Sequence, residues 1–395
     1  MPYGMKQAAK TSPGPKARYI MIGGFLGAGK TTVLGRLAKH LAGQGLRVGL
    51  ITNDQGRNLV DTAMLRAQGF ATEEISGGCF CCRFNSLVDA VARLTEQSRP
   101  DVFIAEPVGS CTDLAATVAY PLRRLYGAKF TVAPVSVLVD GIRGLRVFGL
   151  EKGGSFSEKV LSIYLKQIEE ADLAVINKCD LLDERRLESL RQAIAARFPG
   201  KEIVAVSARY GTNLDGWFAR ITSEEQVSRT AMEIDYEVYA QGEAMLGWLN
   251  CTVQLAAKGA FDGDKFLSDL AREVQKRLRE AEVAHLKMTL CPDSGLGRIG
   301  VVSLVRNDFV PELALTLEEP VEEGQLIVNL RAEAAPEVLG TAVQEALAAT
   351  ARKFSTLQAT LDHLEHFRPG KPTPTHRFKT VNPGTSSSTA TPRSC

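Results

Sequence analysis

The residues with the clearest chemical meaning form a glycine-rich segment that ends in lysine and threonine. Residues 24–31 read GFLGAGKT, which matches the pattern G-x-x-x-x-G-K-[ST] of phosphate-binding loops. The glycines let the backbone wrap around phosphate groups, and a helix that starts here adds the positive end of its dipole. Lys30 would neutralise the outer phosphates, and the Thr31 hydroxyl would bind Mg²⁺. The predicted phosphate-binding residues are Gly24, Gly27, Ala28, Gly29, Lys30, Thr31 and Thr32.

A second motif indicates the base of the nucleotide. Residues 177–180 read NKCD after an apolar run, and N-K-x-D is the segment with which GTPases read guanine. The carboxylate of Asp180 can accept hydrogen bonds from guanine N1 and N2, a donor pair that adenine lacks. The motif therefore favours GTP over ATP. The predicted base-binding residues are Asn177, Lys178, Asp180, Ser207 and Ala208.

Two carboxylates follow apolar runs that read as parallel strands. Glu106 lies three residues before Gly109, and Asp54 ends the preceding apolar run. Ligands of such sheets bind at the carboxyl ends of the strands, so both acids are candidates for holding Mg²⁺ or the attacking water. Either acid is also compatible with a simple strand end. The predicted catalytic residues are Lys30, Thr31, Asp54 and Glu106.

Three of the eight cysteines lie within four residues, in the segment GGCFCC at residues 77–82. Thiolates are soft ligands that suit Zn²⁺ or another thiophilic transition metal. Three ligands leave one coordination position open, as in a transfer or catalytic site. We therefore predict metal binding by Cys79, Cys81 and Cys82, with Cys111 as a further candidate ligand. The alternatives are buried apolar cysteines or a redox pair.

The elements around these motifs predict an α/β domain, because β-branched runs alternate with helical patterns over the first ~215 residues. A mostly parallel sheet flanked by helices follows from this order. The predicted strands are 18–23, 47–53, 101–106, 136–140, 173–177 and 203–207. The predicted helices are 30–41, 86–96, 157–170 and 184–198, and the glycine-rich stretch 146–155 is predicted to be a loop.

A smaller α+β unit is predicted after Trp217. Its predicted strands are 249–255, 286–291, 298–305 and 325–330. Its predicted helices are 264–282 and 336–354, the second extending to His366, so that His363 and His366 share a face. The predicted domains are a disordered N-terminus 1–17, a GTPase domain 18–220, a connector 221–233, an α+β domain 234–368 and a disordered tail 369–395, which is rich in Pro, Ser and Thr.

Charge and hydropathy limit the cellular location and the classes of binding partner that we expect. The net charge of +2 gives no reason to expect nucleic acid or an anionic membrane as a partner. No apolar run approaches the ~20 residues that span a bilayer, and the N-terminus has no apolar signal core. We therefore expect a cytoplasmic protein with no membrane contact.

The motifs GGFLGAGKTT, GGCFCC, EPVG and NKCD, in this order over residues 18–220, resemble those of the CobW-like metal-handling GTPases. This group also holds the nickel-insertion GTPases UreG and HypB. The resemblance implies GTP hydrolysis coupled to delivery of a metal ion or metallocofactor, with nucleotide state changing metal affinity at the three cysteines. It also implies a client metalloenzyme and a GTP-dependent homodimer. Residues 53–56 (NDQG) and 106–109 (EPVG) depart from the family's N-E-F-G and E-T-T-G, and the histidine-rich stretch of many members is absent.

Three functions fit these motifs. The first is a GTP-dependent metallochaperone, and the second is a GTPase that loads or reactivates a corrinoid enzyme. The third is a GTP-gated regulatory protein whose zinc is structural. No arginine finger or water-orienting glutamine is evident, so slow intrinsic turnover is expected.

Overall fold

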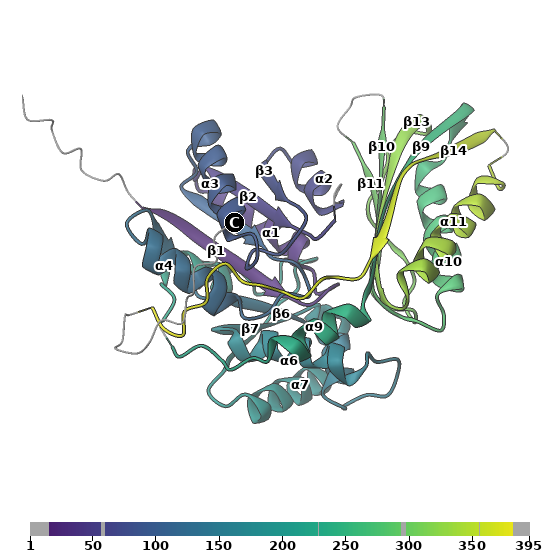
Figure 1. The fold of residues 1–395 in the computed structure, drawn as a ribbon. Coiled ribbons are helices and arrows are strands. Elements are labelled where there is room, and N and C mark those ends of the chain that lie inside the picture. Colours follow the sequence, from purple (N-terminus) through teal and green to yellow (C-terminus); the bar gives the residue numbers. More distant parts are fainter. Residues whose placement is uncertain (1–15, 57–59, 228, 294–297, 355, 382–395) are drawn as a thin grey trace, which may run out of the picture.

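Two β-sheets stand side by side in the computed structural model, each with its own helices (Figure 1). The structure describes residues 16–56, 60–227, 229–293, 298–354 and 356–381. The N-terminal half of the chain builds a parallel sheet, and the C-terminal part builds an antiparallel one. The predicted α/β fold with a smaller α+β domain is therefore confirmed.

The parallel sheet has eight strands in the order β3-β2-β4-β1-β6-β7-β8, with β5 paired to β1. The strands are β1 Ala17–Gly24, β2 Val48–Asn53, β3 Ala71–Ile75, β4 Val102–Glu106, β5 Phe130–Val132, β6 Ser136–Asp140, β7 Leu173–Asn177 and β8 Glu202–Ala205. The helices are α1 Lys30–Gly43, α2 Val60–Ala67, α3 Phe84–Ser98, α4 Tyr120–Tyr126, α5 Gly141–Val147, α6 Glu158–Glu170, α7 Glu184–Arg197, α8 Leu214–Ser223 and α9 Tyr236–Met245. A π-helical turn, Ala115–Ala119, leads into α4, and a 3₁₀ turn, Cys179–Leu181, follows β7.

Apart from Ser136 and the polar residues at their carboxyl ends, strands β4, β6 and β7 are apolar because helices cover both faces of the sheet. Every residue of β4, β6 and β7 is buried. Leu37 of α1 and Trp217 of α8 belong to one apolar core, and Phe84 of α3 and Ile163 of α6 belong to the other. This packing fixes the carboxyl ends of β1, β2, β4 and β7, which carry the predicted site residues.

The six strands of the second sheet are arranged in the order β12-β11-β10-β13-β9-β14, and all neighbours are antiparallel. They are β9 Gly247–Phe261, β10 Glu282–Pro292, β11 Gly300–Leu304, β12 Glu312–Leu315, β13 Val321–Glu333 and β14 Leu357–Phe367. Helices α10 Gly263–Arg277 and α11 Pro336–Ala351 cover one face. Helix α9, predicted to belong to this unit, packs on α6 instead. We therefore propose a domain boundary between α9 and β9.

The two faces of the second sheet differ in chemistry because side chains alternate along a strand. Leu286, Met288 and Leu290 of β10 join the apolar core under the helices. The opposite face carries polar side chains that are nevertheless buried. They are Asn250, Thr252, His285, Thr289, Asn329 and Arg331. Several of them contact the domain built on the parallel sheet, called the nucleotide domain below, and this domain covers the polar face.

The predicted continuation of the last helix to His366 is wrong. Helix α11 ends at Ala351, and residues 357–367 form β14, which pairs with β9 along the edge of the sheet. Pairing with β9 outweighs the helix propensity of the alanines and leucines in this segment. His363 and His366 therefore lie on a strand and do not share a helix face.

Other local predictions also change. Strands β3 and β5 were not predicted, because β3 is interrupted by two glutamates and β5 has only three residues. Helix α5 extends to Val147 and so includes the start of the stretch 146–155 that was predicted to be a loop.

The chain after Pro369 runs back across the nucleotide domain as an extended segment, drawn in yellow in Figure 1. Thr375 N–H donates to Cys81 O at 2.9 Å, and Phe378 N–H donates to Ala116 O at 2.9 Å. Arg377 pairs with the buried carboxylate of Asp113 at 2.7 Å. Residues 369–381 are thus held on the domain, where the sequence predicted disorder. Residues 1–15 and 382–395, the remainder of the predicted disordered ends, lie outside the described residues.

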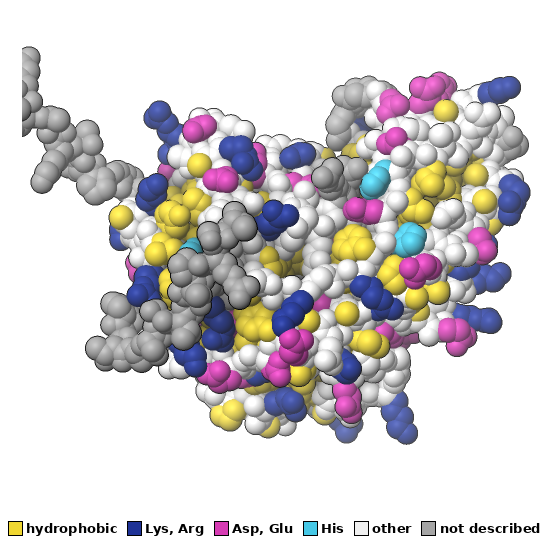
Figure 2. Space-filling view, in the orientation of Figure 1, with side chains coloured by type: hydrophobic (Ala, Val, Ile, Leu, Met, Phe, Trp, Pro, Cys, Tyr) yellow, Lys and Arg dark blue, Asp and Glu magenta, His cyan; other side chains and the backbone are white. Residues whose placement is uncertain are grey.

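The surface combines both signs of charge. On the face shown in Figure 2, basic and acidic side chains are interspersed over both domains. Within the described ranges, no helix is long and apolar enough to cross a membrane.

Candidate nucleotide and metal site

The glycine-rich loop joins β1 to α1 and curls around the ammonium group of Lys30. Lys30 Nζ donates to Gly24 O at 2.9 Å. Burial lowers the pKa of Lys30, and Glu106 partly offsets this effect. Gly24 has φ 134°, and a Cβ there would lie 2.6 Å from Leu138 O. Only glycine fits this position, because the backbone of Gly24 lies against Leu138 and leaves no room for a side chain.

Thr31 lies between two carboxylates. Its Oγ1 is 2.6 Å from Asp61 Oδ1 and 3.2 Å from Glu106 Oε1. Burial and the neighbouring Asp61 raise the pKa of Glu106 to about 7, against the opposing effect of Lys30. Glu106 Oε2 is buried and has no hydrogen-bond partner among the described residues. A hydroxyl and two carboxylates with an unused oxygen are a donor set that suits Mg²⁺, so the residues present fit this ion.

Asp54 does not join this group. Its Oδ1 accepts from Arg331 at 2.8 Å and from the Gly56 N–H at 2.9 Å. Arg331 belongs to β13, so Asp54 connects the nucleotide domain to the second sheet. Asp61, at the start of α2, takes the place beside Thr31 that the sequence assigned to Asp54. No motif marks Asp61 in the sequence, and the fold alone brings it there.

The predicted base-binding residues are held against the phosphate loop. Asn177 Nδ2 donates to Ala28 O at 2.8 Å, and its Oδ1 accepts from Ala208 N–H at 3.0 Å. Lys178 Nζ donates to Gly27 O at 2.8 Å and pairs with Asp140 at 2.5 Å. The predicted phosphate-binding and base-binding residues therefore meet at one edge of the sheet.

The remaining residues of this group complete the edge. Asp180 is exposed just beyond Lys178, and buried Ser207 accepts from the Tyr210 N–H at 3.2 Å. Because Asp180 is exposed, its carboxylate is accessible to a nucleotide base. Thr32, the last residue of the predicted phosphate loop, is exposed in the first turn of α1.

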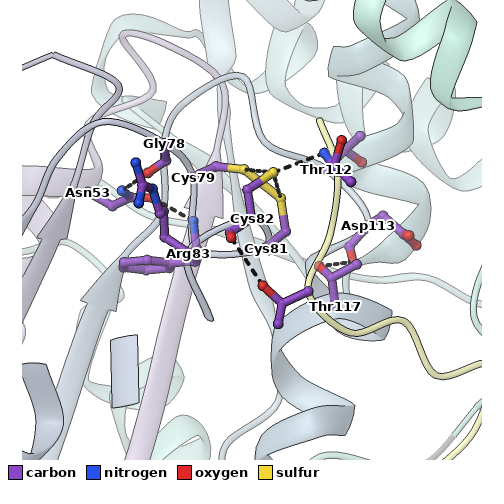
Figure 3. Close-up of a disulfide and its surroundings, with 12 residues drawn as sticks. Asn53, Gly78, Cys79, Cys81, Cys82, Arg83, Thr112, Asp113 and Thr117 are labelled. Carbon is purple, nitrogen blue, oxygen red and sulfur yellow. Dashed lines mark hydrogen bonds between the residues drawn. A yellow bond between two sulfur atoms is a disulfide. The ribbon is translucent and has the colours of Figure 1, made fainter. Parts of the chain in front are cut away.

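The three clustered cysteines converge in one loop between β3 and α3, as Figure 3 shows. Their sulfur atoms lie within 4.8 Å of one another. Cys82 Sγ is 3.4 Å from Cys79 Sγ and 3.6 Å from Cys81 Sγ. Sulfurs bound to one tetrahedral zinc at about 2.3 Å would be separated by roughly 3.8 Å. Both distances from Cys82 Sγ are close to this value, whereas Cys79 Sγ and Cys81 Sγ are bonded to each other.

The oxidation state of the thiols matters for metal binding. The structure joins Cys79 and Cys81 as a disulfide, and Cys82 is free. A metal binds thiolates, so this pair has to be reduced before the site can hold an ion. Burial raises the pKa of Cys82, and the Thr373 N–H, 3.2 Å from its sulfur, acts in the opposite direction. A redox pair, the alternative left open by the sequence, would therefore consist of Cys79 and Cys81, which also belong to the candidate metal site.

Other candidate ligands lie apart from this cluster. Cys111 is buried and is not among the thiols that group within 4.8 Å. His363 faces Glu365 at 3.8 Å on β14, and His366 packs against Gly340 of α11. Within the described part of the chain, neither histidine belongs to a group of three or more metal-ligating side chains.

Asn53, the last residue of β2, holds the thiol loop in place. Its Nδ2 donates to Ile75 O at 2.9 Å and to Gly78 O at 2.7 Å, and its Oδ1 accepts from Phe80 N–H at 2.9 Å. The adjacent Thr52 shares a 2.8 Å hydrogen bond with Thr62 of α2. The end of β2 therefore contacts both the thiol loop and the helix that carries Asp61.

The second sheet supplies a cation that sequence patterns did not reveal. Lys287 of β10 pairs with Asp61, and its Nζ lies 3.3 Å from Thr31 Oγ1. Burial would lower the pKa of Lys287, but Asp61 and Glu106 outweigh it and raise the pKa. Nearby, Arg143 of α5 donates to Val283 O at 3.1 Å and so ties β10 to the nucleotide domain. The alternation of polar and apolar residues along 285–290 is the only sequence signal that pointed to a polar face here.

Parts of this chain are similar in sequence to known proteins. Residues 18–205 match the family model described as CobW/HypB/UreG, nucleotide-binding domain. The zinc chaperone CobW of Sinorhizobium sp is 31% identical over 201 residues, which are 45% of this chain and 55% of that protein. The zinc chaperone YeiR of Escherichia coli K12 is 37% identical over 170 residues, or 41% of this chain and 47% of that protein.

The crystal structure of Zn(II)-bound YjiA GTPase from E. coli is 15% identical with a TM-score of 0.36, and the match covers 86% of this chain and 99% of that one. The chain spans about half the length of the curated relatives it matches. The phosphate loop, the NKCD segment and the matched residues confirm the resemblance found in the sequence. Over residues 18–205, this chain is similar to the nucleotide-binding domain of the CobW/HypB/UreG family.

Proposed function

We propose that this chain is a GTP-hydrolysing zinc chaperone, which binds Zn²⁺ at Cys79, Cys81 and Cys82 and releases it to a client protein when the nucleotide changes. The observation that carries this proposal is the position of the β2 end, Thr52 and Asn53, between the phosphate site and the thiol loop. The names of the relatives, which are zinc chaperones, favour zinc among the thiophilic metals.

Hydrolysis would use the residues around the phosphate loop. Water attacks the γ-phosphate in line with the departing GDP, and Lys30 and the loop N–H groups stabilise the charge on the equatorial oxygens. Thr31, Glu106 and Asp61 would hold Mg²⁺, which would neutralise negative charge on the outer phosphates. Glu106, with its free oxygen, would orient the water.

Coupling between the two sites would run through β2 and α2. A change at Thr31 moves Asp61 and so the start of α2, and Thr62 transmits this movement to Thr52 through their hydrogen bond. The next residue, Asn53, holds two groups of the thiol loop, Gly78 O and Phe80 N–H, and the end of β3 at Ile75 O. Two discrete arrangements of this short path would give two metal affinities, as a nucleotide-controlled chaperone requires.

The thiol cluster suits transfer better than a structural role. Only three sulfurs group there among the described residues, and Cys82 is half-buried. An open fourth position lets a client ligand enter before the metal leaves. The client and a GTP-dependent homodimer belong to this proposal as predictions.

The experiment is zinc titration of reduced protein against a competing chelator. Wild type should bind one Zn²⁺, and Cys82→Ser should weaken binding by roughly 100-fold, since a zinc-thiolate site gains about 3 kcal/mol per ligand. Cys291→Ser, a half-buried cysteine outside the cluster, is the matched control and should bind as wild type does. Equal affinity in Cys82→Ser would refute the site, and unfolding of the domain on zinc removal would favour structural zinc.

Base selectivity is tested separately. Asp180→Asn should bind GTP more weakly and accept xanthosine triphosphate, because an amide can donate to the carbonyl that xanthine carries in place of the guanine amino group. Hydrolysis of ATP and GTP by wild type at equal rates would contradict a guanine site.

A further inference from the structure

Lys287 is directed at the phosphate site by the strand that carries it. On β10, the neighbours Leu286 and Met288 point into the apolar core under α10 and α11, so Lys287 points to the opposite side. There it pairs with Asp61, and its Nζ lies 3.3 Å from Thr31 Oγ1. The side chains of Lys287 and Asp61 are each only 18% exposed.

Strand β10 is fixed over the phosphate loop, so this position is not a chance contact of a flexible side chain. A Cβ on Gly27 would lie 3.0 Å from Ala284 O, which shows how closely β10 approaches the loop. Arg143 reaches from α5 to Val283 O and to Val305 O. Charged groups on rigid strands keep their geometry better than groups on loops.

The partners of Lys287 are those that Mg²⁺ would use. The Nζ atom contacts Thr31 and Asp61, and Glu106 lies on the other side of Thr31, so the three groups that fit the ion meet at this point. Two cations cannot share one hydroxyl and one carboxylate at close range without strong repulsion. With Mg²⁺ on Thr31 and Asp61, the ammonium group would need a new anionic partner, and the outer phosphate of GTP held by the adjoining loop would supply one.

We infer that Lys287 binds the γ-phosphate of GTP and is a catalytic cation supplied within the chain by the second domain. This inference rests on the GTP hydrolysis proposed above. During hydrolysis the water oxygen forms a bond to the γ-phosphorus while the bond to the β-phosphate oxygen breaks, and GDP keeps the electron pair. The water proton passes to the phosphate product. Lys287 transfers no proton and stabilises the charge on the γ-phosphate oxygens, the role of an arginine finger.

The consequence is that the second domain takes part in the chemistry. The sequence shows no arginine finger near the motifs, because the cation lies 256 residues from Thr31 along the chain. The domain therefore completes the nucleotide site in addition to covering it.

The test compares Lys287→Met, Lys287→Arg and wild type in full-length protein. In single-turnover assays, Lys287→Met should hydrolyse GTP at least roughly 100-fold more slowly, and Lys287→Arg should recover part of the rate. The second measurement is trapping of GDP by aluminium fluoride, which mimics the transferred phosphate. Wild type and Lys287→Arg should form this complex and Lys287→Met should not, while GDP affinity stays as in wild type.

Asp308→Asn is the matched control, because Asp308 pairs with Arg146 across the same domain boundary but away from Thr31. This variant should hydrolyse and trap as wild type does. Wild-type hydrolysis or trapping by Lys287→Met would overturn the inference, and so would an equal loss in Asp308→Asn, which would indicate a general effect of domain contact. If wild type itself does not hydrolyse GTP, the proposed function fails, a result distinct from normal hydrolysis by Lys287→Met.

Discussion

The contact between Asp54 and Arg331 allows a structural and a catalytic role to be separated by one substitution. Arg331 has no exposed side-chain surface, and Asp54 is its anionic partner at 2.8 Å. Its other partners are neutral: Leu249 O at 2.7 Å, Leu330 O at 2.9 Å, Asn250 Oδ1 at 2.8 Å and the Trp248 ring at 4.1 Å. Asp54→Ala would leave a buried guanidinium without a counter-charge.

The size of the effect follows from this environment. Removing one partner of a buried ion pair typically costs about 3–5 kcal/mol. Because the carbonyls, the amide and the aromatic ring remain, we expect the lower end, about 3 kcal/mol. At about 2–4 °C per kcal/mol, the melting temperature should fall by roughly 6–12 °C. Asp54→Asn keeps an acceptor for Arg331 and should lose about half as much.

The assay is urea unfolding followed by tryptophan fluorescence. The chain has two tryptophans, and Trp248 lies under Arg331, so a Trp217→Phe background reports on this contact. The double variant Asp54→Ala/Arg331→Met should be more stable than Asp54→Ala alone, since it removes the unpaired charge. GTP hydrolysis should change less than about tenfold in Asp54→Ala, because Asp54 does not contact Thr31.

An unfolding free energy of Asp54→Ala within about 1 kcal/mol of wild type would refute the structural role of this carboxylate. A loss of hydrolysis of roughly 100-fold or more at unchanged stability would do the same, because the carboxylate would then act at the metal as the sequence alone suggested.

Three further predictions concern other parts of the chain. Glu106→Gln should bind GTP but hydrolyse it at least roughly 100-fold more slowly in single-turnover assays, and a normal rate would remove Glu106 from the chemistry. Burial raises the pKa of Glu243 and of Glu170 to about 8, so the folded state holds more protons than the unfolded state between about pH 4.5 and 8. The free energy of unfolding should therefore fall as pH rises through this window, by up to about 1.4 kcal/mol per pH unit for each group. In thermal melts at several pH values, Glu243→Gln should show a smaller dependence of stability on pH. A wild-type protein that gains stability toward pH 8 would contradict this. Truncation after Arg368 removes the Thr373 contact to Cys82, so iodoacetamide should modify Cys82 roughly tenfold faster, whereas truncation after Val381 should leave the rate unchanged.

Sequence patterns predicted the parts of the fold whose cause is local. The phosphate loop and the NKCD segment depend on a few neighbouring residues, and β6 and β7 were predicted with their observed ends because continuous apolar runs have clear limits. The three cysteines converge because they lie within one loop. These features needed no knowledge of distant residues.

Contacts between distant residues could not be predicted in this way. Asp61, Lys287 and Arg331 carry no motif. Asp61 lies beside Thr31 because α2 packs near α1, whereas Lys287 and Arg331 reach Asp61 and Asp54 because the two sheets pack together. Strand β14 was missed because the order of its residues suits a helix until β9 is available as a partner. The segment 369–381 is ordered by contacts to Cys81, Cys82 and Asp113, which no local pattern announces.

In the proposed function, the bound nucleotide controls the affinity of Cys79, Cys81 and Cys82 for zinc. The most direct measurement is the Zn²⁺ dissociation constant of reduced wild-type protein, determined by chelator competition with saturating GDP and with a non-hydrolysable GTP analogue. The two constants should differ by at least about fivefold, the lower end of typical coupling between sites, and the difference should disappear in Cys82→Ser. Equal constants in the two nucleotide states of the wild-type protein would contradict it.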